Sequence, residues 1–228
     1  MNGRSNPPAV VFDDVSFRYK AHGEWIVQKI MFSIFQGEWV CVVGGNGSGK
    51  STLIKLMNGL LKPTSGTVRV FGNDTANGDS GMIRQRIGVI FQNPDTQTVG
   101  ATVEEDVAFG LENLACPRSE INLQVDRILS LLRLDELRHQ PIRCLSGGQK
   151  QLVAIAGVLA MNPEIIIFDE ATSMLDPNHA FRLLTIMSSL HRSGIAIVHI
   201  THDPEEMMKA DRIMVLDGGR LAFDGNVR

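Results

Sequence analysis

The sequence predicts an α/β fold in which a parallel sheet forms the core, and a smaller antiparallel sheet and an inserted set of helices are attached to it. Short, nearly continuous apolar runs are typical of parallel strands that helices cover on both faces. Three such runs occur, at 39–43, 165–168 and 195–200. Between 102 and 161 the apolar residues instead recur with helical spacing, which predicts the inserted helices.

Alternating apolar and polar residues predict three early strands, because half-buried strands expose every second side chain. The stretch 11–19 has this pattern, and 30–34 and 67–71 repeat it. We expect these strands to form a small, largely antiparallel sheet before or around the parallel core. The apolar face expected for the first strand consists of Val11, Val15, Phe17 and Tyr19.

Start and stop signals divide the remainder of the chain. Thr102 and Glu105 have the spacing of a capping box, which predicts a helix start. Ser119 is the predicted N-cap of the next helix. The single apolar face of that helix is expected to contain Ile121, Val125, Ile128 and Leu132. Two glycines, Gly218 and Gly219, between apolar runs predict a closing hairpin.

The composition is that of a folded chain with a sizeable core, since 43% of the 228 residues are hydrophobic. The formal net charge is −3 and the basic residues are scattered, so the broad positive surface that nucleic-acid binding requires is not evident. Three widely spaced cysteines without a CxxC pair indicate neither a zinc site nor a disulfide framework. They fit a reducing, cytoplasmic setting.

Any membrane association is expected to be peripheral. The longest uncharged stretch, 151–163, is too short to cross a bilayer and is interpreted as a core helix. Residues 1–9 are polar and contain proline, and they lack the apolar segment of a secretory signal.

A glycine-rich loop fits the phosphate-binding pattern GxxxxGK[ST], directly after the strand expected at 39–43. Glycines let backbone N–H groups approach a phosphate without obstruction by a Cβ, and the N-terminus of the following helix adds a positive dipole. An ordinary glycine turn is the alternative, which the strand and helix on either side disfavour. The expected apolar face of the helix comprises Leu53, Leu56, Met57 and Leu60. The predicted nucleotide-binding residues are Gly44, Gly45, Asn46, Gly47, Ser48, Gly49, Lys50, Ser51 and Thr52.

Two adjacent carboxylates, Asp169 and Glu170, end the apolar run at 165–168, where ligands of a parallel sheet usually bind. Acidic residues after a strand are common, so the pair alone is weak evidence. Because it follows a phosphate loop in the same chain, it indicates a site for a metal ion and a water. Lys50 is expected to contact the β- and γ-phosphates, and Ser51 and Asp169 to bind Mg²⁺. Neighbouring residues at a strand end point in different directions, so Glu170 can contact an attacking water while Asp169 contacts the metal.

A second anion site is predicted at the start of a later helix. Ser146 is its expected N-cap, and a hydroxyl with glycine amides at a helix N-terminus can bind phosphate without a lysine. A plain helix start is the alternative. The stretch resembles the LSGGQ signature of ABC ATPases and precedes the carboxylate strand as in that family. The residues expected to contact nucleotide here are Ser146, Gly147, Gly148 and Gln149.

The resemblance covers essentially the whole chain and implies its fold: a P-loop NTPase (RecA-like) core, an ABC antiparallel β-subdomain and an inserted α-helical subdomain. Within residues 1–228 we place the nucleotide-binding core at 1–95 and 162–228 and the helical subdomain at 96–161. The resemblance also implies that the signature of one subunit closes over the γ-phosphate bound to the P-loop of a second subunit, head to tail.

Other family elements follow in order. Tyr19 resembles the aromatic residue that stacks on adenine, with Trp25 as a nearby rival. Gln92 resembles the Q-loop glutamine, which contacts Mg²⁺ and water and senses the membrane partner. Residues 173–176 resemble the D-loop, which crosses the dimer interface, and we count Asp176 among the nucleotide-contacting residues.

His202 resembles the switch histidine that bonds the γ-phosphate and holds the geometry of water and Glu170. Together with Lys50 and Gln92, these two residues are the expected catalytic set. During hydrolysis, the signature of the opposing subunit would also stabilise the charge on the equatorial phosphate oxygens. His199, on the preceding strand, is expected to be a packed core histidine.

Within the family, residues 91–110 and 169–177 resemble the energy-coupling factor (ECF) importers and, among these, the first of two ATPase subunits. The resemblance implies ATP and Mg²⁺ as cofactors and a second ABC ATPase subunit, either a paralogue or self. It also implies a transmembrane coupling protein and a membrane subunit that binds vitamins or transition-metal ions, with this chain peripheral at the cytoplasmic face of the cell membrane. The coupling surface is expected at 92–110, where Asp95 would receive arginines of the coupling protein.

Three alternatives stay open. The chain can energise another class of ABC transporter, or it can be a soluble ABC ATPase acting on ribosomes or chromosomes, although such proteins carry two cassettes, coiled coils or basic insertions. An inactive regulatory cassette would lack Lys50, Glu170 or His202. ECF ATPases continue past the final hairpin into a C-terminal extension, which we expect to be absent because the sequence stops at Arg228.

Overall fold

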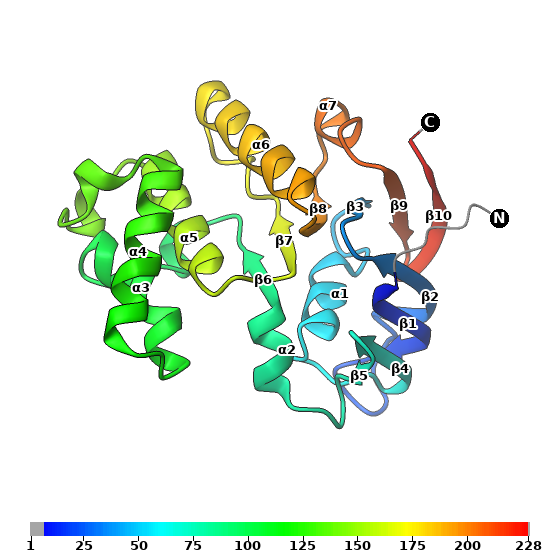
Figure 1. The fold of residues 1–228 in the computed structure, drawn as a ribbon. Coiled ribbons are helices and arrows are strands. Elements are labelled where there is room, and N and C mark those ends of the chain that lie inside the picture. The colour runs from blue at the N-terminus through cyan, green and yellow to red at the C-terminus, as the bar shows by residue number, and fades with distance from the viewer. Residues whose placement is uncertain (1–6, 228) are drawn as a thin grey trace.

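A six-stranded sheet forms the centre of the computed structural model, which describes residues 7–227 (Figure 1). Five of its strands are parallel, and β10 pairs with β9 in the antiparallel direction. The order across the sheet is β10 (Arg220–Asn226), β9 (Arg212–Asp217), β3 (Trp39–Val43), β8 (Ala196–Ile200), β7 (Ile165–Asp169) and β6 (Ile87–Ile90). The predicted parallel core and closing hairpin are thus confirmed.

A separate four-stranded antiparallel sheet lies beside the first (Figure 1). Its order is β2 (Val27–Phe35), β1 (Pro8–Phe17), β4 (Ser65–Val70) and β5 (Asn73–Asp74). All three predicted early strands are present in it, and the expected α/β fold with an added antiparallel sheet is confirmed.

The apolar face predicted for the first strand is wrong in part. The pairing of β1 is irregular between Phe12 and Val15, where Asp14 has a φ of 49°. This bulge shifts the alternation by one residue, so Phe12 is buried and Val11 only half-buried. Tyr19 lies beyond the end of the strand and is exposed.

Helices cover the six-stranded sheet, and three of them pack together at one end of it (Figure 1). These three, called the helical group below, are α3 (Val103–Asn113), α4 (Arg118–Leu132) and α5 (Gly147–Ala160). The other helices are α1 (Lys50–Met57), α2 (Ser80–Arg86), α6 (Pro177–Arg192) and α7 (Pro204–Met207), and short 3-10 turns occur at η1 (Pro94–Thr96), η2 (Asp135–Leu137) and η3 (Ile142–Cys144).

Two predicted helix boundaries need correction. The N-cap of α4 is Pro117 rather than Ser119, because proline is already fixed near the φ that a helix entry needs, here −59°. Ser119 therefore lies in the first turn, although the expected apolar face of α4 is buried. Helix α1 ends at Met57, before Gly59 turns the chain with a φ of 71°, so Leu60 is exposed rather than part of the apolar face.

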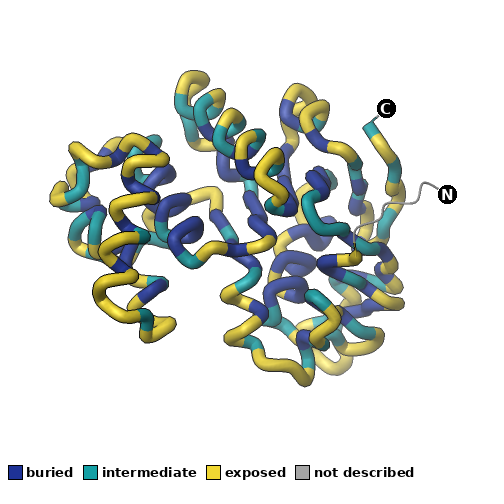
Figure 2. Tube along the Cα trace, viewed as in Figure 1, coloured by how far each residue is buried: buried dark blue, intermediate teal, exposed yellow. Residues whose placement is uncertain are grey.

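The two faces of the six-stranded sheet bury different clusters, as Figure 2 shows by the buried layers on both sides. On β7, Ile166 and Phe168 pack toward the helical group and α6, whereas Ile165 and Ile167 pack toward α1 and the antiparallel sheet. This two-sided burial explains the continuous apolar runs in the sequence. Across residues 7–227, no helix combines the length and the apolarity needed to span a bilayer.

The capping box at the start of α3 provides a test of this part of the fold. The Thr102 side chain accepts the N–H of Glu105, and the Glu105 carboxylate accepts the N–H of Thr102. We expect Thr102→Ala to lower the free energy of unfolding by about 1 kcal/mol, measured by chemical denaturation. Leu123→Ala, on an exposed site of α4, is the control, and equal stability of both variants would contradict this role for the cap.

Candidate active site

The glycine-rich loop lies between β3 and α1 and has a backbone that only glycine permits at its two ends. Gly49, the N-cap of α1, has a φ of 106° and offers no side chain to cover the first N–H groups of the helix. At Gly44 an added Cβ would lie 2.6 Å from the Ser48 Oγ and closer still to the Leu216 carbonyl oxygen. The loop therefore leaves helix N–H groups available to an anion, as a phosphate cradle requires.

Lys50 is the first residue of α1, and its side chain is enclosed by the loop. Its Nζ donates to the carbonyl oxygens of Gly44, at 2.6 Å, and Gly45, at 3.1 Å. Only 8% of Lys50 is exposed, whereas Ser51 is exposed and Thr52 buried. The arrangement brings an ammonium group and a free hydroxyl to the same end of the helix.

The two carboxylates lie at the end of the neighbouring strand β7. Asp169 is the last residue of β7 and pairs in register with Ile200 on β8. Burial raises the pKa of the Asp169 carboxyl, as does the charge of Glu170, while Lys50 and Lys55 lower it. A half-buried carboxylate near the charge of Lys50 is suited to bind a cation at the mouth of the loop.

Glu170 is directed at His202. Its Oε1 lies 3.2 Å from the Nε2 of His202, so the predicted base and switch histidine are in contact. Glu170 holds a left-handed φ of 52°, which is unusual for a residue with a side chain, and its N–H donates to the carbonyl oxygen of Ile200. This conformation turns the chain sharply after β7 and separates the direction of Glu170 from that of Asp169.

Gln92, in the loop after β6, contacts the segment that follows Glu170. Its Nε2 donates to the Ser173 Oγ at 3.1 Å, and that hydroxyl donates to the Glu170 carbonyl oxygen at 2.8 Å. Gln92 is thus linked through Ser173 to the backbone of Glu170, whose side chain contacts His202.

A buried network beneath the site was not predicted from the sequence. Glu206 of α7 accepts a hydrogen bond from Thr201 at 2.5 Å and lies 3.2 Å from His199 Nε2. Burial raises the pKa of Glu206, but hydrogen bonds from His199, Thr201 and Thr172 outweigh this and hold it below its usual value. The stability that the network contributes is therefore present above the unfolded pKa of the carboxyl and is lost as the pH falls through the folded one.

His199 is fully buried, as expected for a core histidine, with its ring near Trp39 and Phe168. Glu206 is the functional neighbour that sequence reasoning missed. Its only local signal is its place four residues after His202, in a short helix, and that signal does not reveal the contact with Thr172.

The signature residues form the predicted helix start. Ser146 is the N-cap of α5, and a capping box joins it to Gln149 in both directions, with Gln149 N–H donating to Ser146 Oγ and Ser146 N–H to Gln149 Oε1. At Gly147 a side chain would meet open space. Figure 1 shows α1 and α5 on opposite sides of β7, and their buried side chains belong to different clusters on the two faces of the sheet.

The two aromatic candidates differ in what covers them. The guanidinium of Arg18 lies 4.6 Å from the ring centre of Trp25. Tyr19 touches Phe17 in an edge arrangement and is 59% exposed. The exposed ring of Tyr19 remains the better candidate for stacking.

Asp176 and Asp95 have partners within the chain. Asp176 is the N-cap of α6 and accepts the N–H groups of Asn178 and His179. Asp95 is paired with Lys150, whose Nζ lies 2.6 Å from its carboxylate. Any arginine of a partner protein would therefore share this carboxylate with Lys150.

The donor set fits a magnesium ion that binds together with a nucleotide. Residues 7–227 contain no group of three or more His, Cys, Asp or Glu side chains that could hold a metal alone. Mg²⁺ is usually held by one or two protein oxygens plus phosphates and waters. The hydroxyl of Ser51 and the half-buried carboxylate of Asp169 provide oxygen ligands of that kind.

A parallel sheet with a phosphate loop, a carboxylate pair and a separate signature helix defines an ATP-binding cassette ATPase. The family model for ABC transporters matches residues 27–173. The chain belongs to this family and, within it, to the group of energy-coupling factor transporter ATP-binding proteins. It is accordingly an ATP-binding, ATP-hydrolysing protein, as expected from its sequence.

The similarity to individual relatives extends along nearly the whole chain. The energy-coupling factor transporter ATP-binding protein EcfA1 of Mycoplasma pneumoniae is 46% identical over 95% of this chain and 78% of the relative. EcfA1 of Enterococcus faecalis is 48% identical over 96% of this chain and 79% of the relative.

Two solved structures share the fold. CbiO1 of Clostridium perfringens, part of the ABC transporter complex CbiONQ, superposes with a TM-score of 0.88 at 36% identity and covers 96% of this chain and 89% of that one. A dimeric ATP-binding cassette in a post-hydrolysis state with ADP and Pi has a TM-score of 0.85 at 30% identity, covering 96% and 99%.

The enclosure of Lys50 leads to a direct test of the phosphate cradle. Removing the ammonium in Lys50→Ala is expected to weaken binding of a fluorescent ATP analogue by roughly 10- to 100-fold, which corresponds to a charge-assisted hydrogen bond of about 1.5–3 kcal/mol. Lys62→Ala, an exposed site after α1, is the control. Equal affinities of the two variants would exclude Lys50 from the phosphate site.

Proposed function

We propose that this chain is the ATP-hydrolysing subunit of an ECF-type ABC importer and energises uptake of a vitamin or a transition-metal ion through a membrane coupling protein. The observation that carries the proposal is the contact of Glu170 with His202 at 3.2 Å, at the same sheet edge as the phosphate loop. The names of the relatives, which are ECF transporter ATP-binding proteins, supply the transport context.

Each side chain at the sheet edge has a proposed part in hydrolysis. Glu170 polarises the attacking water as general base, and His202 bonds the γ-phosphate and holds Glu170 in place. Lys50 stabilises charge on the β- and γ-phosphates. Ser51, Asp169 and Gln92 would hold Mg²⁺, which supplies positive charge to the phosphate oxygens when bound. Tyr19 stacks on the adenine.

The complete site is proposed to need two chains. The phosphate loop of one subunit would bind ATP, and the other subunit would cover it with Ser146, Gly147, Gly148, Gln149 and Asp176. The placement of α1 and α5 on opposite sides of β7 within the chain supports this arrangement. The similar cassette bound to ADP and Pi was also determined as a dimer. The second subunit is either a paralogue or a copy of this chain.

Movement would pass to the membrane through residues 92–110, which connect the proposed core (1–95 and 162–228) to the proposed helical subdomain (96–161). A groove of about 120 Å³ lies here between α3 and α5, with Val99 and Phe109 among its lining residues, both of them exposed. The exposed apolar side chains of Val99 and Phe109 suit contact with the apolar face of a helix of the coupling protein. The chain would then lie peripherally at the cytoplasmic face of the cell membrane, with a substrate-binding membrane subunit in the same complex.

The general-base role predicts the behaviour of Glu170→Gln. The amide keeps the shape of the side chain but cannot accept a proton, so steady-state ATP hydrolysis should fall by about two to four decades. Binding of ATP should be preserved, since the phosphate loop is untouched. Wild-type turnover in a phosphate-release assay would refute the assignment of this base.

The contact proposed for Asp95 is tested by reversing its charge while keeping the pair with Lys150. In the double variant Asp95→Lys, Lys150→Glu an ion pair is retained inside the chain, but the exposed partner becomes positive. We expect stability to change by less than about 1 kcal/mol, as for surface pairs, while co-purification with the membrane coupling protein is lost. Assembly and transport at wild-type levels would dispose of the arginine contact.

A further inference from the structure

His179, in the first turn of α6, is held by the carboxylate that caps its own helix. One oxygen of Asp176 accepts the N–H groups of Asn178 and His179, at 3.0 and 3.2 Å. The other oxygen lies 2.5 Å from the Nδ1 of His179. That hydrogen bond is the main cause that lowers the pKa of Asp176. The orientation of the imidazole ring is therefore fixed by the D-loop.

The same ring lies against the signature segment. A Cβ added to Gly148 would be 2.5 Å from the Cγ and 2.7 Å from the Nε2 of His179, which is closer than real Cβ contacts. The ring thus occupies the space in which a side chain at position 148 would lie. Gly148 belongs to the helix N-terminus that we propose to cover the phosphate of a partner chain, so His179 connects this segment with Asp176.

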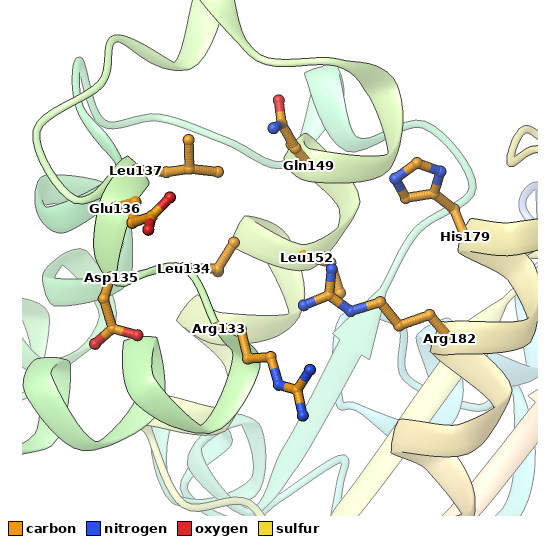
Figure 3. A pocket seen from close by; sticks show the side chains of 9 residues that line it. All are labelled: Arg133, Leu134, Asp135, Glu136, Leu137, Gln149, Leu152, His179 and Arg182. Carbon is orange, nitrogen blue, oxygen red and sulfur yellow. The ribbon is translucent and has the colours of Figure 1, made fainter.

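A cavity of about 520 Å³ separates the helical group from α6 beside this contact, as Figure 3 shows. Its lining comes from the end of α4 and η2, from Gln149 and Leu152 of α5, and from His179 and Arg182 of α6. Arg182 donates to the carbonyl oxygen of Leu132 at 2.6 Å. Beside this cavity, the contact of His179 with Gly148 and the hydrogen bond from Arg182 to Leu132 join α6 to the helical group.

We propose that His179 is a positioning residue for ATP hydrolysis. It determines the position of Gly148 relative to the D-loop carboxylate Asp176. Because Gly148 lies in the first turn of α5, it thereby determines the position of the α5 N-terminus as well. It acts through these two neighbours and does not touch the nucleotide. The inference rests on the proposed function of the signature as a phosphate contact for the partner chain.

The first test is ATP hydrolysis by the purified full chain under conditions in which the wild type turns over. His179→Ala should lower kcat by about 10- to 100-fold, since small misplacements of a catalytic surface have effects of this size. The Kd for a fluorescent ATP analogue should stay at the wild-type value, because Lys50 and the phosphate loop are unaffected. His179→Asn retains a side-chain N–H for Asp176 and should restore much of the lost kcat.

The second test uses the steric relation between the ring and the glycine. Gly148→Ala should strongly reduce turnover in the wild-type background, because the new Cβ meets the His179 ring. In the His179→Ala background the space is open, so the same substitution should cost several-fold less, a non-additivity expected only for residues in contact. Full additivity of the two substitutions, or wild-type kcat in His179→Ala, would overturn the proposal.

Ser146→Ala separates failure of this inference from failure of the function on which it rests. If Ser146→Ala and Gly148→Ala both hydrolyse ATP at the wild-type rate, the signature has no phosphate role and both proposals fail. If they are impaired but His179→Ala is not, only the positioning role fails. Thermal melting of each variant shows whether it is folded. If His179→Ala melts at a lower temperature than the wild type, the kcat of His179→Asn tests the proposal instead, together with the effect of Gly148→Ala in the His179→Asn background.

Discussion

The register of three neighbouring parallel strands is the constraint on which the candidate active site depends. Val42 of β3 pairs with Ile200 of β8, and Ile200 pairs with Asp169 of β7. Because parallel strands end at the same edge of the sheet, the loop after β3, the histidine after β8 and the carboxylates of β7 leave the sheet at one level. A shift of one residue in β7 would point Asp169 to the opposite face and remove it from the field of Lys50.

The sharp turn at Glu170 shows how this edge is converted into a directed site. A left-handed conformation costs a residue with a side chain roughly 1–2 kcal/mol, and the surroundings offset that cost by binding both backbone groups of Glu170. Its N–H donates to Ile200 and its carbonyl oxygen accepts from Ser173. The buried Glu206 network fixes Thr201 and Thr172 immediately beneath. The two segments that carry Glu170 and His202 are therefore held from below by one carboxylate.

The parts of this protein that depend on contiguous residues could be predicted from the sequence. The phosphate loop, the strand ending in Asp169 and the N-cap Ser146 all lie where local pattern and backbone chemistry indicate. The errors have local causes as well. At Ser119 the fixed φ of Pro117 determined the helix start, and at Val11 the bulge at Asp14 changed the phase of the strand.

Contacts between distant segments could not be predicted in the same way. The pairing of Asp95 with Lys150, the tie of Thr172 to Glu206 and the contact of His179 with Gly148 each join elements whose relative placement follows only from the packed fold. A histidine three residues into a helix has no local pattern that distinguishes it from a solvated surface residue.

The proposed division of the site between two chains gives side-chain contacts such as that of His179 with Gly148 a large influence on how the site is assembled. A catalytic group on the same strand edge as its substrate is positioned by the sheet, whose hydrogen bonds leave little freedom. The signature instead begins a helix that belongs to the helical group and is separated from α6 by a cavity. The first turns of α5 are held toward β6 by the hydrogen bond that Gln151 donates to the carbonyl oxygen of Phe91. Toward α6 they are held by the side chains that bridge the two helices. In this chain, Asp176 caps α6 and orients His179 against Gly148, so one D-loop carboxylate links the position of the signature to the core.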